Sequence, residues 1–236
     1  MSAVRVDVWS DVACPWCWVG KRNLARAASE AGVEVELHWH AFELDPSAPK
    51  SLPEGGLSLV QRLAQKYGVS EPQAQQMIDR MTAVGASVGL EFRFERVVPT
   101  STFDAHRLLA WAAGKGKQDA LAERLFEAYM HEGERVSDPE VLVRAVEAVG
   151  LDADAAQAVL SGDDYSREVR NDRTEASQMG VTGVPFFVFD GKYAAAGAQP
   201  PDVLAKVLTR VVEERPVLVT EGEVCGPDGC VLPEPG

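Results

Sequence analysis

The sequence predicts an α/β fold in which a large all-helical domain is inserted into a small sheet domain. Three observations predict it: residues 4–40 alternate as strand, helix and strand, helical patterns fill residues 46–177, and strand patterns return near residue 186. A chain of 236 residues is long enough to bury the core of such a protein.

The first three elements follow from local patterns. Valine alternates with other residues in VRVDVW (residues 4–9), which is the period of a strand with one buried face. After a short turn, Pro15 suits the first position of a helix, where its missing N–H loses no hydrogen bond. Gly32 ends that helix, and the alternation in VEVELHWH (33–40) gives the second strand.

The predicted insertion spans residues 46–177. It begins at a break rich in Pro and Gly, PSAPKSLPEGG (46–56). The helical segments beyond this break end at or near glycine, and several begin at Asp or Ser; they are residues 57–68, 71–89, 101–116, 119–133, 138–150 and 152–162. One stretch, 90–99, is predicted to be extended. A block of this length is too long for a loop, so we predict an inserted helical domain.

The closing part of the chain returns to strands. An apolar run (186–189), the turn Asp190-Gly191 and residues 193–196 predict an antiparallel hairpin. A final helix is expected over residues 199–215, ended by Pro216, followed by a loop-like tail over 216–236. This order of elements is that of a split thioredoxin fold, with residues 1–45 and 178–215 forming the thioredoxin-like domain.

Composition excludes several classes of protein. The net charge of −13 argues against nucleic acid or an anionic membrane surface as a partner. No apolar run approaches the ~18 residues of a membrane span, and the N-terminus has none of the regions of a secretion signal. We therefore expect a cytoplasmic protein. In that compartment cysteine pairs are more often catalytic or metal-binding than structural.

The motif Cys14-Pro15-Trp16-Cys17 stands where the first strand passes into the helix. This spacing places both sulfurs on one face of the first helical turn, within reach of a disulfide. The unpaired N–H groups and partial positive charge of the helix N-terminus favour a thiolate at Cys14. We expect Cys14 to be the nucleophile and Cys17, one turn deeper, to be the resolving thiol.

Several segments together resemble one known family. They are VWSDVACPWCWVGK, HWHAFELDP, STFDAHRLLAWA, LFEAYMHEG and VTGVPFFVFDGKYAAAGAQP, in this order within residues 3–212. In them the chain resembles the DsbA-like, FrnE-type disulfide oxidoreductases, which are related to the hydroxychromene-carboxylate isomerase and kappa glutathione transferase group. The resemblance implies a thioredoxin fold with a helical insertion. It also implies that Val184-Pro185 is a loop with a cis proline facing the CxxC motif.

The resemblance implies dithiol–disulfide exchange on protein or peptide thiols and disulfides, because the isomerase and kappa relatives usually carry Ser where Cys14 or Cys17 stands. Strongly oxidising relatives have His where Trp16 stands, so we expect a less oxidising pair. No cofactor is expected to be required, although glutathione or thioredoxin can serve as the electron partner. A monomer and a dimer are both compatible with the sequence.

Two other functions fit the cysteines. A glutathione-dependent isomerase or transferase would use Cys14 to bind glutathione. A zinc-binding protein without enzymatic activity would use all four cysteines as a tetrathiolate site. Dithiol–disulfide exchange accounts best for a CPxC motif at a strand–helix junction. No metal site is therefore predicted.

Other residues near these motifs have alternative roles. Trp16 and Trp18 either pack in the core or form an apolar rim that receives substrates. His106, Trp18 and Phe42 are candidates for a substrate pocket, although His106 also fits a hydrogen-bonded core histidine. The remaining histidines are expected to be solvated; they are His38, His40 and His131.

The tail carries a second cysteine pair, Cys225 and Cys230, separated by Gly-Pro-Asp-Gly. That composition makes a tight turn able to bring the two sulfurs together. We therefore predict a second redox pair that exchanges with Cys14 and Cys17, with an incidental or metal-binding pair as the alternative.

Overall fold

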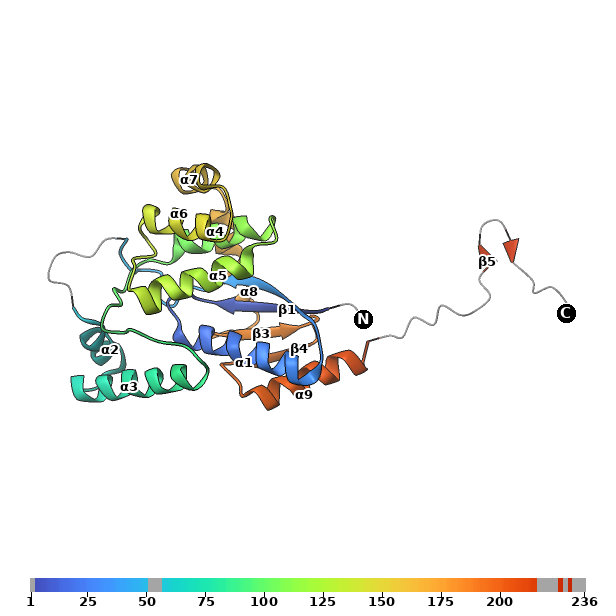
Figure 1. Cartoon of the computed structure of the whole chain (residues 1–236), viewed down its shortest axis with the longest axis horizontal. Coiled ribbons are helices and arrows are strands. Elements are labelled where there is room, and N and C mark those ends of the chain that lie inside the picture. Colours follow the sequence, from blue (N-terminus) through green and yellow to red (C-terminus); the bar gives the residue numbers. More distant parts are fainter. Residues whose placement is uncertain (1–2, 51–56, 216–224, 227–228, 231–236) are drawn as a thin grey trace.

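The fold is built on a four-stranded mixed sheet in the order β2-β1-β3-β4 (Figure 1). The structure is a computed structural model, and it describes residues 3–50, 57–215, 225–226 and 229–230. β1 pairs in parallel with β2, whereas β3 is antiparallel to both β1 and β4. The strand bounds are β1 (Val4–Ser10), β2 (Val35–Ala41), β3 (Phe186–Phe189) and β4 (Tyr193–Ala196).

One face of this sheet is covered by α1 (Pro15–Ala31) and α9 (Pro201–Glu213), which pack side by side (Figure 1). The register places Val6 beside Phe189 and Val8 beside Phe187, and these four side chains are buried in the main core together with Val4. The alternation seen in the sequence therefore defines the face that packs against the two helices.

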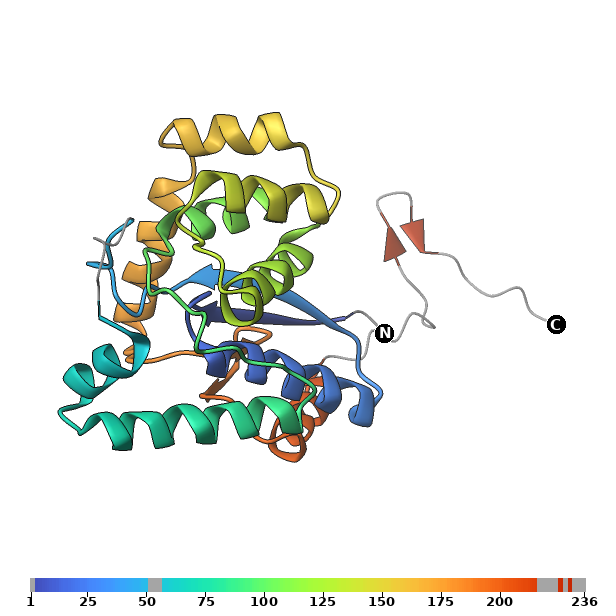
Figure 2. The same cartoon turned by 60° about the vertical axis from the view of Figure 1, so that its left-hand side comes forward.

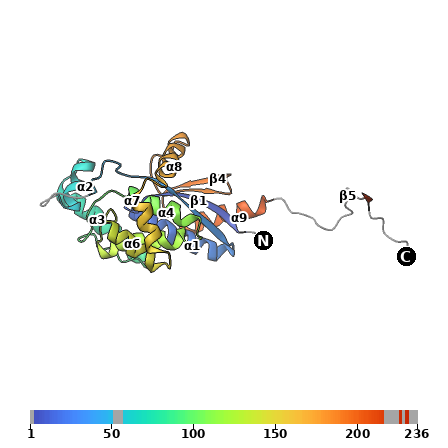
Figure 3. The same cartoon turned by 90° about the horizontal axis from the view of Figure 1, so that it is seen from above.

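The remaining helices form the insertion and reach the other side of the sheet. Figure 2 shows α2 and α3 as a hairpin apart from the bundle of α4 to α7, and Figure 3 shows α8 on the sheet face opposite α1. The bounds are α2 (Leu59–Tyr67), α3 (Glu71–Ser87), α4 (Phe103–Ala113), α5 (Gln118–Glu127), the π-helical turn η1 (Ala128–Glu132), α6 (Pro139–Ala148), α7 (Ala153–Ser161) and α8 (Ser166–Gln178). The predicted α/β class with a helical insertion is confirmed.

Local signals fix several element ends as predicted. α1 begins at Pro15 with Cys14 as its N-cap, and Gly32 ends it in the left-handed conformation. Asp190 and Gly191 both have positive φ (47° and 67°), and together with Lys192 they form the three-residue turn that joins Phe189 to its paired residue Tyr193.

The stretch 90–99 is not a strand, although its alternating aromatic residues suggested an extended segment. Phe92 instead packs against Trp18, with ring centroids 5.8 Å apart, and against Phe94. The alternation therefore reflects burial against a helix rather than pairing in a sheet.

Among the described residues, none of the helices combines the length and apolar character that a membrane span needs.

Arg215 is the last residue of the continuous described chain. It is held at the end of the sheet where β1 begins. Its guanidinium donates to the carbonyl of Ala3 at 2.8 Å and to the Asp190 carboxylate, also at 2.8 Å. The end of α9 therefore lies at the edge opposite the CxxC motif, which follows the C-terminal end of β1.

The tail contributes two short strands, β5 (Cys225–Gly226) and β6 (Gly229–Cys230), which pair so that Cys225 lies opposite Cys230. The side chains of these cysteines, and residues 227–228 between the strands, lie outside the described part of the chain. The proposed second redox pair therefore stays a prediction.

Candidate functional site

Cys14 and Cys17 lie at the N-terminus of α1, at the C-terminal edge of the sheet. Cys14 has an extended backbone, and its carbonyl accepts a 3.0 Å hydrogen bond from the N–H of Cys17, which closes the first turn. Both are free thiols and both are buried, with exposed fractions of 4% and 1%. Trp16 between them is 45% exposed. The motif therefore presents an aromatic side chain to solvent above two shielded sulfurs.

The surroundings of Cys17 keep it protonated. Burial raises the pKa of the Cys17 thiol well above 9.0, and a hydrogen bond and the charge of Cys14 raise it further. The hydroxyl of Ser10 and the backbone of Asp11 act in the opposite direction without reversing the shift. A thiol that loses its proton only late in the reaction fits the predicted role of Cys17 as the resolving group.

The loop before β3 faces Cys14. The Val184–Pro185 peptide bond is cis, which confirms that prediction. The Cys14 Sγ donates to the carbonyl oxygen of Val184 at 3.5 Å. Pro185 also packs closely on α1, since a Cβ built on Gly20 would lie 3.0 Å from its Cγ. Cys14 is thus held between the helix N-terminus and the backbone of this loop.

Asp11 is a buried residue of the site that sequence reasoning missed. Its carbonyl accepts from the N–H of Cys14 at 2.9 Å. Its carboxylate accepts from the N–H groups of Ala13 (3.2 Å) and Leu44 (2.7 Å), and lies 3.5 Å from Nε2 of His106. One side chain therefore joins the cysteine loop, the segment after β2 and helix α4.

These partners also control the ionisation of Asp11. Burial alone would raise the pKa of the carboxyl group, but the nearby His106 imidazole and the N–H groups of Leu44 and Ala13 lower it below its ordinary value of 3.8. Asp11 is therefore an anion at neutral pH.

We expect Asp11→Asn to lower the free energy of unfolding by about 3 kcal/mol near pH 7. An amide has one acceptor oxygen where the carboxylate has two, so the N–H of Ala13 or of Leu44 loses its buried acceptor. Folding lowers the pKa of Asp11, so its contribution is present above the ordinary value of 3.8 and is lost as the pH falls through the folded value. The difference between wild type and variant in urea unfolding should therefore shrink in acid. Exposed Asp163→Asn is the matched control, and a variant equal to that control at pH 7 would contradict the assignment.

Trp18 and His106 lie in the core. Trp18 is 5% exposed, stacks on Phe126 with centroids 6.0 Å apart, and donates from Nε1 to Glu123 at 2.9 Å. His106 is 3% exposed and faces Asp11. Trp18 still lines an open hollow together with Arg22 and Glu123. Phe42 is half-buried and packs in the same cluster as Val184. The role of Trp18, His106 and Phe42 in a substrate pocket stays a prediction.

The apolar surface near the cysteines comes from three separate segments. Each segment carries one large exposed side chain: Trp16 (45% exposed), Leu44 (37%) and Met179 (42%). The second segment also contains Phe42 and the third Val184, and both of these are partly buried. These segments follow β1, follow β2 and precede β3, so all three approach the sheet at the edge that carries Cys14.

The prediction that His40 is solvated is wrong. Its ring stacks on Trp9 with centroids 4.4 Å apart, and its two nitrogens each lie 2.9 Å from a carboxylate oxygen, of Asp172 and of Asp7. Burial lowers the pKa of His40, but the two carboxylates outweigh it and the net shift is upward. The alternation correctly placed His40 on the polar face of β2, but α8 covers that face.

The comparisons with known proteins agree with this fold. A model of the DSBA-like thioredoxin domain family matches residues 5–209. The crystal structure of a probable DsbA oxidoreductase, SCO1869 from Streptomyces coelicolor, is similar at 41% identity and a TM-score of 0.83, covering 98% of this chain and 99% of that one.

More distant relatives share the fold over most of their length. An uncharacterized protein of Bacillus subtilis, YwbO, is 28% identical over 209 residues, which is 87% of this chain and 96% of that protein. A 2-hydroxychromene-2-carboxylate isomerase structure is similar at 15% identity with a TM-score of 0.64, covering 89% of this chain and 97% of that one. At that identity the similarity concerns the fold alone.

Proposed function

Because the chain belongs to the DSBA-like thioredoxin domain family, we propose that it is a thiol–disulfide oxidoreductase that acts on protein disulfides through Cys14 and Cys17. The observation that carries the proposal is the arrangement of Cys14, which caps a helix N-terminus and contacts the Val184 carbonyl while Cys17 lies buried and protonated behind it. A nucleophile at the entrance and a resolving thiol one turn deeper are the two groups that exchange requires.

The chemistry proceeds by two displacements. The Cys14 thiolate attacks one sulfur of a substrate disulfide, that S–S bond breaks, and the released substrate thiolate takes up a proton. Cys17 then loses its proton and attacks the Cys14 sulfur, which releases the second substrate sulfur as a thiolate that is protonated in turn. The substrate disulfide is reduced and the Cys14–Cys17 pair is oxidised; the reverse sequence oxidises a substrate dithiol.

The surroundings support a polypeptide substrate in an extended conformation. Trp16, Leu44 and Met179 are exposed apolar side chains on the three segments that meet at the end of the sheet where Cys14 lies. Pro185 has no N–H to compete for the substrate backbone, and the backbone of Val184 can pair with it. Glutathione or thioredoxin in the cytoplasm would return the Cys14–Cys17 pair to its starting state.

Two rates test this function: the reduction of insulin disulfides, and the recovery of activity by scrambled ribonuclease. We expect the protein to accelerate both, with glutathione needed only for turnover. An activity that is absent without glutathione and survives Cys17→Ser would instead support the isomerase or transferase alternative. Stoichiometric bound zinc with no activity in either assay would support the zinc-binding alternative.

We further propose that Cys225 and Cys230 exchange with the first pair. The antiparallel pairing that sets Cys225 opposite Cys230 supports this step, since it brings their backbones together. In the double variant Cys225→Ser/Cys230→Ser, the single-turnover reaction of Cys14 should be unchanged while the rate of recycling changes. Stopped-flow Trp fluorescence follows the single-turnover reaction, and steady-state turnover reports the recycling of the Cys14–Cys17 pair. An unchanged rate of recycling in the double variant would contradict the proposal.

A further inference from the structure

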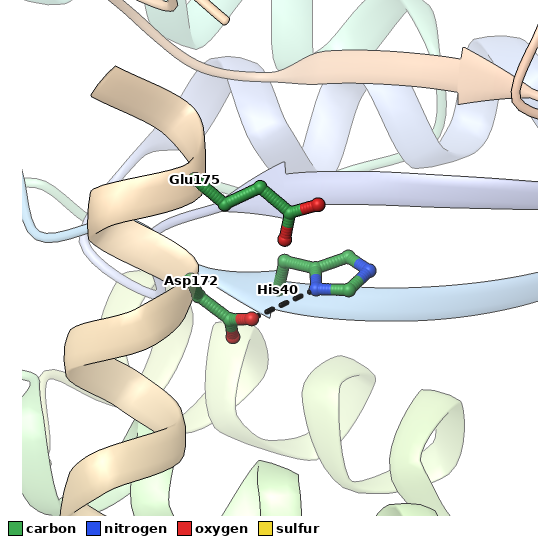
Figure 4. A group of neighbouring side chains, drawn as sticks. All are labelled: His40, Asp172 and Glu175. Carbon is green, nitrogen blue, oxygen red and sulfur yellow. Dashed lines mark hydrogen bonds and ion pairs between the residues drawn. The ribbon is translucent and has the colours of Figure 1, made fainter. Parts of the chain in front are cut away.

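A cluster of three metal-ligating side chains lies where α8 crosses β2, on the sheet face opposite α1 (Figure 4). His40 comes from β2, while Asp172 and Glu175 come from α8 with a spacing of three residues. That spacing places the two carboxylates one above the other on one helix face, and both point toward the imidazole. Nitrogen and oxygen atoms of the three residues all lie within 4.8 Å of one another.

We propose that His40, Asp172 and Glu175 bind a divalent transition-metal ion through one imidazole nitrogen and one oxygen of each carboxylate. Donor atoms that share an ion with ligand bonds of roughly 2 Å lie within about 4 Å of one another. The three donors here are within 4.8 Å, so a small rotation of the exposed Glu175 side chain is needed to complete the set. One imidazole and two carboxylates suit Zn²⁺ and its first-row neighbours, whereas Mg²⁺ and Ca²⁺ take oxygen ligands. The cluster is separate from Cys14 and Cys17 and uses none of their chemistry.

Asp7 and Arg5 hold the His40 ring in place from the side away from the two carboxylates of the cluster. His40 Nε2 lies 2.9 Å from Asp7 Oδ1, and Asp7 is held in turn by the Arg5 guanidinium at 2.6 Å. A metal-binding histidine commonly donates its second ring N–H to a carboxylate in this way, which fixes its tautomer and orientation. Nδ1 then remains as the nitrogen that faces Asp172 and Glu175.

The ring and the first carboxylate are held in place. Trp9 stacks on the His40 imidazole at an interplanar angle of 15°. Asp172 uses Oδ2 to accept from the N–H of Ala41 at 2.8 Å, so Oδ1 is the oxygen that faces His40. Preoriented ligands need little reorganisation when an ion binds.

Glu175 is the residue that a purely structural role does not explain. Among the described residues its carboxylate has no hydrogen bond or ion pair, although it points at His40 (Figure 4). His40, Asp172 and Asp7 would hold α8 to the sheet without it. Glu175 is exposed, so it also leaves the cluster open to entering ions and to water as a further ligand.

The charges of the cluster match a divalent ion. Arg5 balances Asp7, which leaves the two negative charges of Asp172 and Glu175 facing the imidazole. A bound dication would lie between His40 Nδ1 and the two carboxylates and offset their negative charges. It would also join β2 to α8, so metal binding should stabilise the folded chain.

The test is calorimetric titration of Zn²⁺ into the tag-free full chain. Thiols also bind zinc, so all variants carry four further substitutions: Cys14→Ser, Cys17→Ser, Cys225→Ser and Cys230→Ser. We expect one ion per chain at this site, and we expect Glu175→Gln to weaken its affinity about tenfold or more. Glu168→Gln is the matched control, because it makes the same change on α8 seven residues away, about 10 Å along the helix.

Thermal unfolding gives a second readout. Zn²⁺ should raise the Tm of the Glu168→Gln protein and raise that of the Glu175→Gln protein much less, while the two proteins unfold alike without metal. Absence of zinc binding, equal affinity in the two variants, or equally tight binding of Mg²⁺ would each overturn the proposal. His40→Ala is not used, because its effect on packing against Trp9 would obscure the loss of a ligand.

Discussion

Cys14→Ser abolishes disulfide exchange, lowering the rate of insulin reduction by about a thousandfold or more, because a serine hydroxyl is not a nucleophile toward sulfur at neutral pH. Cys17→Ser has a different result. Cys14 remains intact beside Val184, so it still attacks the substrate, but no thiol is left one turn deeper to release it. The variant therefore accumulates a mixed disulfide with its substrate.

The two variants are distinguished by mass spectrometry after mixing with an excess of a peptide disulfide. Cys17→Ser should gain the mass of one peptide thiol at Cys14, and a reductant should remove it. Cys14→Ser should gain none, since the only thiol that remains in its motif is 1% exposed and held protonated. Both variants also carry Cys225→Ser and Cys230→Ser, so the tail adds no mass. Full exchange activity in Cys14→Ser, or equal trapping in both variants, would contradict the assigned roles.

Arg107→Met is expected to destabilise the protein by about 4 kcal/mol, the largest effect on stability of any change proposed for this chain. Arg107 is 3% exposed, and its guanidinium joins α4 to the end of α7 and the start of α8. It donates to the carbonyls of Asp164 (2.8 Å), Gly162 (2.7 Å) and Val159, and to the Asp104 carboxylate at 2.9 Å. Methionine fills similar space but donates to none of these acceptors, and the Asp104 carboxylate then keeps only Lys50 as a partner among the described residues.

The measurement is equilibrium unfolding in urea, followed by far-UV circular dichroism. Arg80→Met is the matched control, since Arg80 is exposed on α3 and has no ion pair within the described chain; it should change stability by no more than about 0.5 kcal/mol. A midpoint for Arg107→Met that coincides with the control would show that the buried network contributes nothing.

The sequence predicts the part of the site that local chemistry determines. Pro15 at a helix start, Gly32 at its end and the Asp190-Gly191 turn each act within a few residues, and all three lie where predicted. The cysteines follow from the same signals, because their position depends on where α1 begins. The order of strands and helices is likewise encoded in the period of apolar residues.

The residues that were missed or misplaced depend on contacts far along the chain. Asp11 is completed by Leu44 and His106, and Arg107 by carbonyls more than fifty residues away. His40 is on the polar face of its strand, as alternation predicts, yet α8 returns 132 residues later to cover it. No local pattern encodes such meetings, so a buried polar residue looks like a solvated one in the sequence.

The anchoring of Arg215 beside Ala3 has a consequence for how the tail cysteines can react. β1 alone separates that edge from the CxxC motif by roughly 23 Å, and the turn to Cys14 adds to it. Cys225 is ten residues beyond Arg215, which span at most about 36 Å when fully extended. A tether with so little slack gives a low local concentration of its own cysteine at Cys14. Tail exchange between two molecules can then compete with exchange within one, and the reaction order in protein concentration reveals which occurs.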